Sequence, residues 1–213
     1  MDSNMQWHHE TRGKKAVSAL EKNGFTAAYF PDCASAAAHL LSLIPDGAGV
    51  GLGGSMTIRD MDIPQKLVEK GCTLFDHSSA NLSPEERNAI RRKQLTADVF
   101  LCSSNAVTMQ GEMVNVDGTG NRVAAMMFGP GRVIIAEGVN KLVESLDEAH
   151  TRIKLVAAPV NSKRLNLPTP CVQTGECADC RSKNRICNLT TIIRRRPPLT
   201  DIHVLVIGEE LGY

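Results

Sequence analysis

The chain has 213 residues, a length that fits one α/β domain with a small appendage. Its formal net charge is +1 at pH 7, which argues against a general role in binding nucleic acid or an anionic membrane. No apolar run approaches the roughly 20 residues that cross a bilayer, and the start lacks the basic-then-apolar order of a signal peptide, so we expect a cytoplasmic protein without a membrane span.

Helical and strand patterns alternate in the first half of the chain. Apolar residues at helical spacing, or in nearly continuous runs, predict helices at 11–23, 34–44, 64–70 and 84–96. Short apolar runs between turn-forming residues predict strands at 25–30, 48–52 and 72–75. The helix at 84–96 begins at a capping box on Ser83. We expect the cations on its polar face to be solvated, namely Arg87, Arg91, Arg92 and Lys93.

The second half continues this alternation. Apolar or alternating runs predict strands at 99–101, 112–116, 133–136 and 202–208. Helices are predicted at 123–128 and at 146–158, where Pro159 should end the second one. The pattern is typical of an α/β fold with an open, mostly parallel, doubly wound sheet and helices on both faces. We expect a single α/β domain over residues 1–213, with a cysteine-rich loop, 168–198, inserted before the last strand.

Two strand-to-helix junctions are rich in glycine and suit the binding of a phosphate or carboxylate. The first contains Gly53, Gly54, Ser55 and Thr57. The second contains Asn115, Asp117, Gly118, Gly120, Asn121 and Arg122. Backbone N–H groups at the start of a helix favour anions. The first junction matches neither a Walker loop nor a dinucleotide-binding fingerprint, and a tight turn with a helix cap is its alternative interpretation.

His77 follows the predicted strand at 72–75, at the edge where open α/β sheets bind their ligands. We expect it to make a polar contact, either with a ligand or within the protein. The residues around it do not have the spacing of a metal-ligand set.

The second junction and its surroundings resemble the lactate-utilisation (LUD) domain family. The resemblance is carried by Asn105-Ala106, Gly111, the run from Asn115 to Arg122, and Gly138-Val139-Asn140-Lys141. It covers about 14–165 and a final strand near His203, and the family is similar to the broader fold of ribose-5-phosphate isomerase, glucosamine-6-phosphate deaminase and the coenzyme A transferases. It implies that the Gly-Gly-Ser segment lines a pocket. We expect this pocket to include Asn105, the second junction, Asn140 and Lys141.

Four cysteines lie within 17 residues in the inserted loop, at Cys171, Cys177, Cys180 and Cys187. Thiols this dense in a reducing compartment usually bind metal. One Cys-x-x-Cys knuckle with looser neighbours favours an iron–sulfur cluster, [4Fe-4S], over zinc, although its spacing is not that of a ferredoxin. Zinc and a metal-free loop remain alternatives. Cys33, Cys72 and Cys102 have apolar surroundings and are interpreted as core residues.

Three hypotheses for function follow. The resemblance implies a component of a cytosolic system that oxidises L-lactate or a similar 2-hydroxy acid through iron–sulfur chemistry, with Arg122 or Lys141 binding the carboxylate and an iron–sulfur or flavin protein as redox partner. A stand-alone enzyme on sugar phosphates or acyl-coenzyme A is the second, although no glutamate stands in a convincing nucleophile motif. A non-enzymatic subunit that binds an anion and docks a redox partner is the third.

Overall fold

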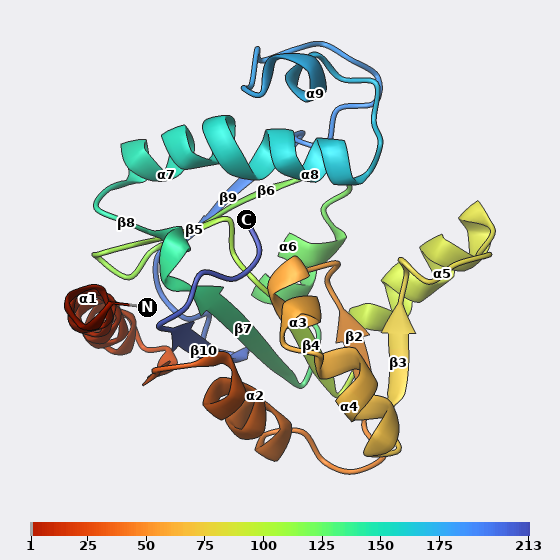
Figure 1. Cartoon of the computed structure of the whole chain (residues 1–213). Helices are drawn as coiled ribbons and strands as arrows, with labels where there is room; N and C mark the ends of the chain where they lie inside the picture. The colour runs from red at the N-terminus through yellow and green to blue at the C-terminus, as the bar shows by residue number, and fades with distance from the viewer. Residues whose placement is uncertain (1) are drawn as a thin grey trace.

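A computed structural model describes residues 2–213 (Figure 1). Six parallel strands form the main sheet, in the order β1 (Thr26–Phe30), β10 (Asp201–Ile207), β7 (Arg132–Gly138), β4 (Val99–Cys102), β2 (Gly49–Leu52) and β3 (Thr73–Asp76). Helices lie on both of its faces, so the predicted open α/β architecture is confirmed. Among residues 2–213, no helix is both long and apolar enough to cross a bilayer.

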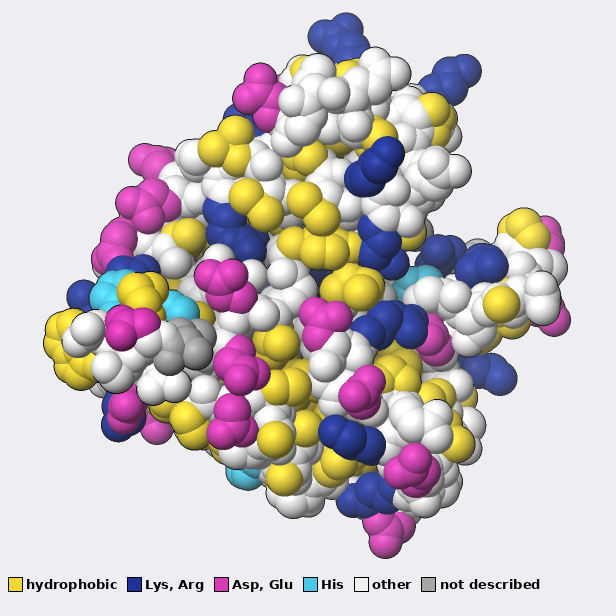
Figure 2. All heavy atoms as spheres, viewed as in Figure 1, with side chains coloured by type: hydrophobic (Ala, Val, Ile, Leu, Met, Phe, Trp, Pro, Cys, Tyr) yellow, Lys and Arg dark blue, Asp and Glu magenta, His cyan; other side chains and the backbone are white. Residues whose placement is uncertain are grey.

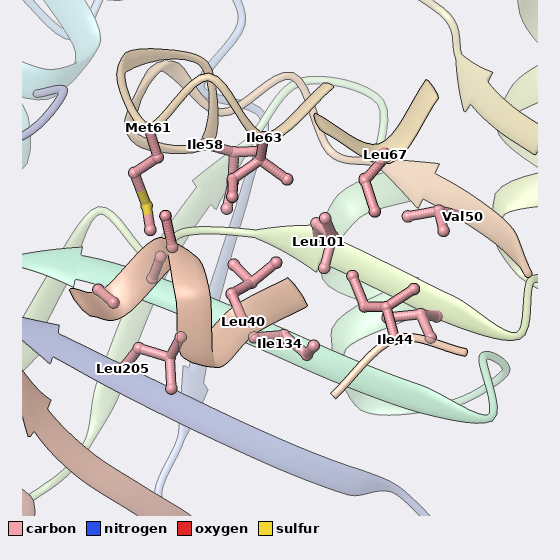
Figure 3. Close-up of a cluster of buried hydrophobic side chains, with 14 of the residues drawn as sticks. Leu40, Ile44, Val50, Ile58, Met61, Ile63, Leu67, Leu101, Ile134 and Leu205 are labelled. Carbon is pink, nitrogen blue, oxygen red and sulfur yellow. The ribbon is translucent and has the colours of Figure 1, made fainter. Parts of the chain in front are cut away.

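The two faces of the main sheet bury different side chains because neighbouring strand residues point in opposite directions. Ile134 and Ala136 pack with α2 (Cys33–Ser42), α3 (Met56–Asp60) and α4 (Ile63–Glu69), in the cluster drawn in Figure 3. Val133 and Ile135 pack on the other side, with α1 (Ser3–Lys22) and α6 (Asn121–Met127). The short apolar strands are thus buried on both faces, as expected for a parallel sheet.

A second sheet of four strands was not predicted. Its order is β8 (Leu142–Val143), β5 (Ala106–Thr108), β6 (Met113–Asp117) and β9 (Leu189–Ile193). It lies on the side of the main sheet that carries α1 and α6, because Val107 and Met113 share a cluster with those helices. The expected single sheet was therefore incomplete, and β9 brings the end of the cysteine-rich loop into the second sheet by pairing with β6.

One long helical segment covers the outer face of the second sheet (Figure 1). It consists of α7 (Leu146–Arg152), a π-helical turn (Ile153–Ala157) and α8 (Ala158–Arg164). The prediction that Pro159 ends the helix was wrong. The wider π turn precedes Pro159, which stands in the first turn of α8, where a missing backbone N–H is tolerated.

The remaining short elements are α5 (Pro84–Gln94), a 3₁₀ turn (Val139–Lys141) and α9 (Pro170–Thr174). The helix α5 lies beside β3 and β2 at one end of the main sheet. The C-terminus ends between the two layers, below α7 and α8 (Figure 1). This arrangement leaves an opening above the carboxyl ends of β2, β3 and β4, where the candidate site lies.

Candidate functional site

A cavity of about 320 Å³ lies between the carboxyl ends of the main-sheet strands and α8. Figure 2 shows the surface hollowed between α8 and α5, with Lys and Arg side chains on both sides. Most of the predicted site residues line this cavity: Gly53, Gly54, Ser55, Thr57, His77, Asn105, Asp117, Gly118, Asn121, Arg122 and Lys141. The wall of the cavity does not include Asn115, Gly120 or Asn140 among its residues.

The second glycine junction shapes one wall. Asp117 ends β6, and its Oδ1 accepts hydrogen bonds from the backbone N–H groups of Thr119 (3.1 Å) and Gly120 (2.7 Å). Gly120 has φ +90°, a left-handed conformation that favours glycine, and it begins α6. Because α6 has only seven residues and α3 five, the helix dipoles contribute less to an anion site than the sequence suggested.

Arg122, the expected carboxylate ligand, is engaged by the protein itself. Its Nη1 donates to the backbone oxygen of Ser103 (2.8 Å) and to Asn115 Oδ1 (2.6 Å). Its Nη2 donates to Asn105 Oδ1 (3.1 Å) and Val116 O (2.9 Å), and its Nε lies 3.4 Å from Asp117 Oδ2. An anion could bind this guanidinium only by displacing one of these partners. Arg122 therefore fixes the wall of the cavity and joins β4, β5 and β6.

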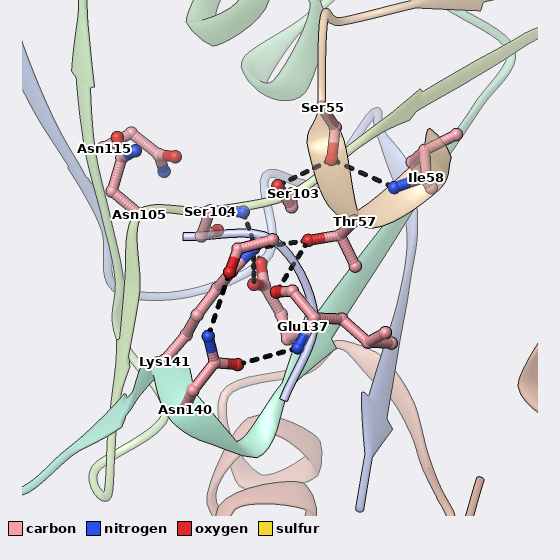
Figure 4. A network of polar contacts seen from close by, with 12 residues as sticks. Ser55, Thr57, Ile58, Ser103, Ser104, Asn105, Asn115, Glu137, Asn140 and Lys141 are labelled. Atoms are coloured by element: carbon pink, nitrogen blue, oxygen red, sulfur yellow. Dashed lines mark hydrogen bonds and ion pairs between the residues drawn. The ribbon is translucent and has the colours of Figure 1, made fainter. Parts of the chain in front are cut away.

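Lys141 lines the cavity and is also bound by groups of the protein, in the polar network drawn in Figure 4. It is 1% exposed, and its Nζ donates to Thr57 Oγ1 (2.6 Å) and lies 3.6 Å from Glu137 Oε2. Glu137 is fully buried and accepts a hydrogen bond from the Ser104 N–H. Burial lowers the pKa of Lys141 and raises the pKa of Glu137, and the charge of each partner opposes the shift of the other. Sequence reasoning missed Glu137, since the apolar strand was expected to end at Ala136.

Asn140 holds the C-terminal tail in place rather than facing the cavity. Its Nδ2 donates to Gly212 O (3.2 Å), and its Oδ1 accepts from the Leu211 N–H (3.2 Å), as Figure 4 shows. The next residue, Tyr213, lines the cavity. Burial raises the pKa of Tyr213, and Arg164 nearby opposes this. The predicted Asn-Lys pair thus positions the tail that closes one side of the cavity.

His77 lies at the end of β3, beside Gly54. The Gln94 amide nitrogen lies 2.9 Å from His77 Nδ1 and within hydrogen-bond distance of the carbonyl oxygens of Leu52 and Phe75, so its two hydrogens are shared among three acceptors. This network favours the tautomer in which Nδ1 accepts and Nε2 carries the proton. Burial lowers the pKa of His77, and Arg91 lowers it further. His77 therefore makes a polar contact within the cavity wall, and its contact with a ligand stays a prediction.

The structure adds three arginines that sequence reasoning did not place in the site. Arg87 and Arg91 on α5 were expected to be solvated, yet both are half-buried and line the cavity. Arg164 on α8 lines it from the mouth. Because a cation on a helix looks the same in sequence whether it faces solvent or a cavity, no local signal distinguished these residues.

The cysteine-rich loop is organised by backbone hydrogen bonds and by Arg185. Nη1 of Arg185 donates to Cys180 O (2.6 Å) and Nη2 donates to Cys187 O (2.8 Å), while the Asp179 N–H lies 3.4 Å from Cys177 Sγ. Burial raises the pKa of Cys187, Arg185 lowers it, and the nearby thiols of Cys177 and Cys180 raise it. Within residues 2–213, no three His, Cys, Asp or Glu side chains converge as a metal site.

The end of this loop forms part of the cavity wall. Ile186 lines the cavity and packs closely against Gly118. The Asn188 N–H donates to Asp117 O (3.0 Å), and its side-chain amide donates to Gly118 O (3.0 Å). Cys187 stands between these two residues, so the loop and the cavity share a wall.

Comparisons with known proteins identify the family of the chain and a solved structure that it resembles. A family model described as the LUD domain matches residues 13–207. A crystal structure of a DUF162 family protein from Deinococcus radiodurans is 13% identical, with 95% of this chain and 98% of that chain covered and a TM-score of 0.50. A D-ribose-5-phosphate isomerase in complex with phospho-erythronic acid is 15% identical over 54% of each chain, with a TM-score of 0.30. None of the curated proteins matches the chain.

Proposed function

Since this chain belongs to the LUD domain family, as its motifs predicted, we propose that it takes part in lactate utilisation as a component of an iron–sulfur-dependent system. The system would oxidise L-lactate or a similar 2-hydroxy acid. The observation that supports this most is the cavity, since its walls carry the family motif together with several arginines. A small carboxylate matches the size and the positive charge of such a site.

Within this proposal the protein residues bind and orient the acid. Arg87, Arg91 and Arg164 supply the positive charge, and His77 supplies a neutral N–H donor. Arg122 and Lys141 keep the walls in place through the contacts described above, and we no longer assign the carboxylate to either of them.

Binding of the acid is tested by isothermal titration calorimetry at low ionic strength with L-lactate, glycolate and pyruvate. Lactamide, which has the same shape without the charge, is the matched control. We expect the acids to bind and lactamide not to bind. Equal affinity for lactate and lactamide would reject an anion site.

We further propose that Cys171, Cys177, Cys180 and Cys187 ligate one metal centre, with a [4Fe-4S] cluster preferred and zinc as the alternative. Their thiol chemistry fits both, and Arg185 would offset the negative charge of the thiolates. The four thiols would have to move together on binding. A bound cluster would supply one-electron transfer for the oxidation, and a redox partner protein of iron–sulfur or flavin type would exchange those electrons.

The metal is tested on protein prepared without oxygen, by absorbance and by analysis of iron, zinc and acid-labile sulfide. Iron and sulfide in equal amounts would support the cluster. Zinc without sulfide would reject the iron–sulfur cluster and would support the same four cysteines as zinc ligands. Disulfides without metal, in protein never exposed to oxygen, would reject the centre.

A further inference from the structure

The cations on the cavity wall fall into two groups. Arg122 and Lys141 have carboxylate partners, at 3.4 Å in Asp117 and 3.6 Å in Glu137. In contrast, Arg87, Arg91 and Arg164 have no carboxylate oxygen within 4.0 Å anywhere in residues 2–213. Three positive charges therefore line one cavity, and none of them is paired with a carboxylate in the described part of the chain; the lining carboxylate Asp117 is paired with Arg122. A monoanion such as lactate would neutralise one of them.

Arg87 and Arg91 stand one turn apart on α5, so their side chains extend from the same face of the helix. Arg87 uses Nη1 to donate to His77 O (2.9 Å), and its other donors have no hydrogen-bond partner among residues 2–213. Nε of Arg91 is buried and has no hydrogen-bond partner within residues 2–213. Arg91 as a whole is half-buried and lines the cavity, so its guanidinium brings a positive charge to the wall together with a donor that the described residues leave unsatisfied.

Arg164 lies on the other side of the cavity, on α8. Both Nε (3.1 Å) and Nη2 (2.7 Å) donate to Asn161 Oδ1, which orients the guanidinium at the mouth beside Tyr213. In Figure 1, α5 and α8 border the opening from different sides, and Figure 2 shows Lys and Arg side chains along both borders. The free positive charge is thus divided between two separate places.

We propose that Arg87 and Arg91 form a second anion subsite, separate from Arg164, and that the cavity binds a 2-hydroxy acid carrying a second, terminal anionic group. This inference rests on the proposed binding of a hydroxy acid and specifies its class. Two guanidinium forks one turn apart match the oxygens of a phosphate or of a second carboxylate. A cavity of about 320 Å³ is at the small end of ligand sites and is large enough for such an acid.

The test compares glycerate with 3-phosphoglycerate by calorimetry on the full chain. The two ligands share the hydroxy acid and differ in the terminal phosphate. Malate tests a second carboxylate in place of the phosphate, and inorganic phosphate tests whether the phosphate group binds without the hydroxy acid. Three variants, Arg87→Gln, Arg91→Gln and Arg91→Lys, alter the subsite. Arg92→Gln, an exposed cation on the same helix, is the matched control. Thermal melting verifies that each variant is folded.

We expect 3-phosphoglycerate or malate to bind at least about 10-fold more tightly than glycerate, and whichever is tighter identifies the second group. Arg87→Gln or Arg91→Gln should remove most of this advantage, because a hydrogen-bonded charge contact contributes about 10- to 100-fold. Arg91→Lys should retain part of it, and Arg92→Gln all of it. An advantage unchanged in Arg91→Gln would overturn the subsite. Phosphate binding as tightly as 3-phosphoglycerate would overturn the hydroxy acid as ligand.

Failure of the second anion subsite can be distinguished from failure of the proposed hydroxy-acid binding. If the wild type binds L-lactate and glycerate but not lactamide, and 3-phosphoglycerate and malate show no advantage over glycerate, the hydroxy-acid cavity stands and the second subsite is rejected.

Discussion

Arg122 and Arg91 are the same residue type on the wall of one cavity, yet their surroundings are opposite. The guanidinium of Arg122 has protein acceptors on both Nη atoms and a carboxylate beside Nε. The buried Nε of Arg91 has no partner within residues 2–213. Since every guanidinium nitrogen of Arg122 has a protein partner, whereas Arg91 lines the cavity without a carboxylate oxygen within 4.0 Å among residues 2–213, we assign the first to structure and the second to binding.

Removing the Arg122 side chain should therefore lower stability. Arg122→Ala leaves Asn115 Oδ1 without its donor and Asp117 without its charge partner, and Asn105 Oδ1 keeps only the Val116 N–H. We expect the free energy of unfolding, measured with urea, to fall by about 2–4 kcal/mol. Arg92→Ala, at an exposed position, should change it by less than about 0.5 kcal/mol. Unchanged stability with loss of lactate binding would instead make Arg122 a ligand-binding residue.

His77 predicts a pH dependence of stability. Burial, together with Arg91, lowers its pKa below the ordinary value of 6.5, and burial also lowers the pKa of His203. Below about pH 6.5 the unfolded chain therefore binds protons that the folded protein does not. The free energy of unfolding should fall as the pH drops from 7.5 to 5.5. His77→Gln should reduce this slope, because it removes a group whose pKa is lowered by folding. Urea titrations at each pH measure the slope, and equal slopes in the wild type and His77→Gln would contradict the assignment.

At the scale of elements, Gly111 joins the second sheet to α1. It has φ +76°, and a Cβ there would lie 2.6 Å from the backbone carbonyl carbon of Ala19. Gly71 has nearly the same backbone, φ +77°, but a Cβ there would meet no atom within 4 Å. Substitutions at Gly111 and Gly71 therefore distinguish the free-energy cost of a left-handed backbone from the free-energy cost of a steric clash.

Both Gly111→Ala and Gly71→Ala should lower the free energy of unfolding by roughly 1 kcal/mol, because alanine is strained in the left-handed conformation. Gly111→Ala should lower the free energy of unfolding by about 1–3 kcal/mol more than Gly71→Ala, because the added methyl group forces α1 away from the β5–β6 turn. Chemical denaturation of the two variants measures the difference. If both lost the same free energy, α1 would not be packed as tightly on this turn as the structure has it.

The elements of the main sheet could be predicted because its strands are buried on both faces and appear as apolar runs. The second sheet could not, because β5 has three residues and β8 two, too few to show a period. The strand β9 lies within the segment assigned to the cysteine-rich loop. The polar residues of the site were predicted from the ends of strands, but Arg87, Arg91 and Arg164 were not, since their contact with the cavity depends on how α5 and α8 pack.

At the scale of the whole molecule, the cysteine-rich loop connects the two layers. It leaves α8, returns as β9 in the second sheet, and the chain then enters the main sheet as β10. The three buried apolar clusters found in residues 2–213 contain no residue between 166 and 188. The core therefore does not depend on the part of the loop before β9, although Ile186 and Asn188 fix the end of that part to the cavity wall.

This separation predicts what loss of the proposed metal centre does. In a loop without a core, metal binding supplies the free energy that orders the chain. Cys180→Ser, or chelation of the metal, should increase hydrogen exchange over 171–187 by about 10-fold or more, while β9 stays protected by its pairing with β6. The melting temperature of the main sheet should change by only a few degrees.

Cys72→Ser, outside the loop, is the matched control and should leave exchange at 171–187 unchanged. Hydrogen exchange with mass spectrometry measures these regions separately. Global unfolding on chelation, or exchange at 171–187 that does not respond to Cys180→Ser, would show that the loop is ordered by something other than a metal bound at these thiols.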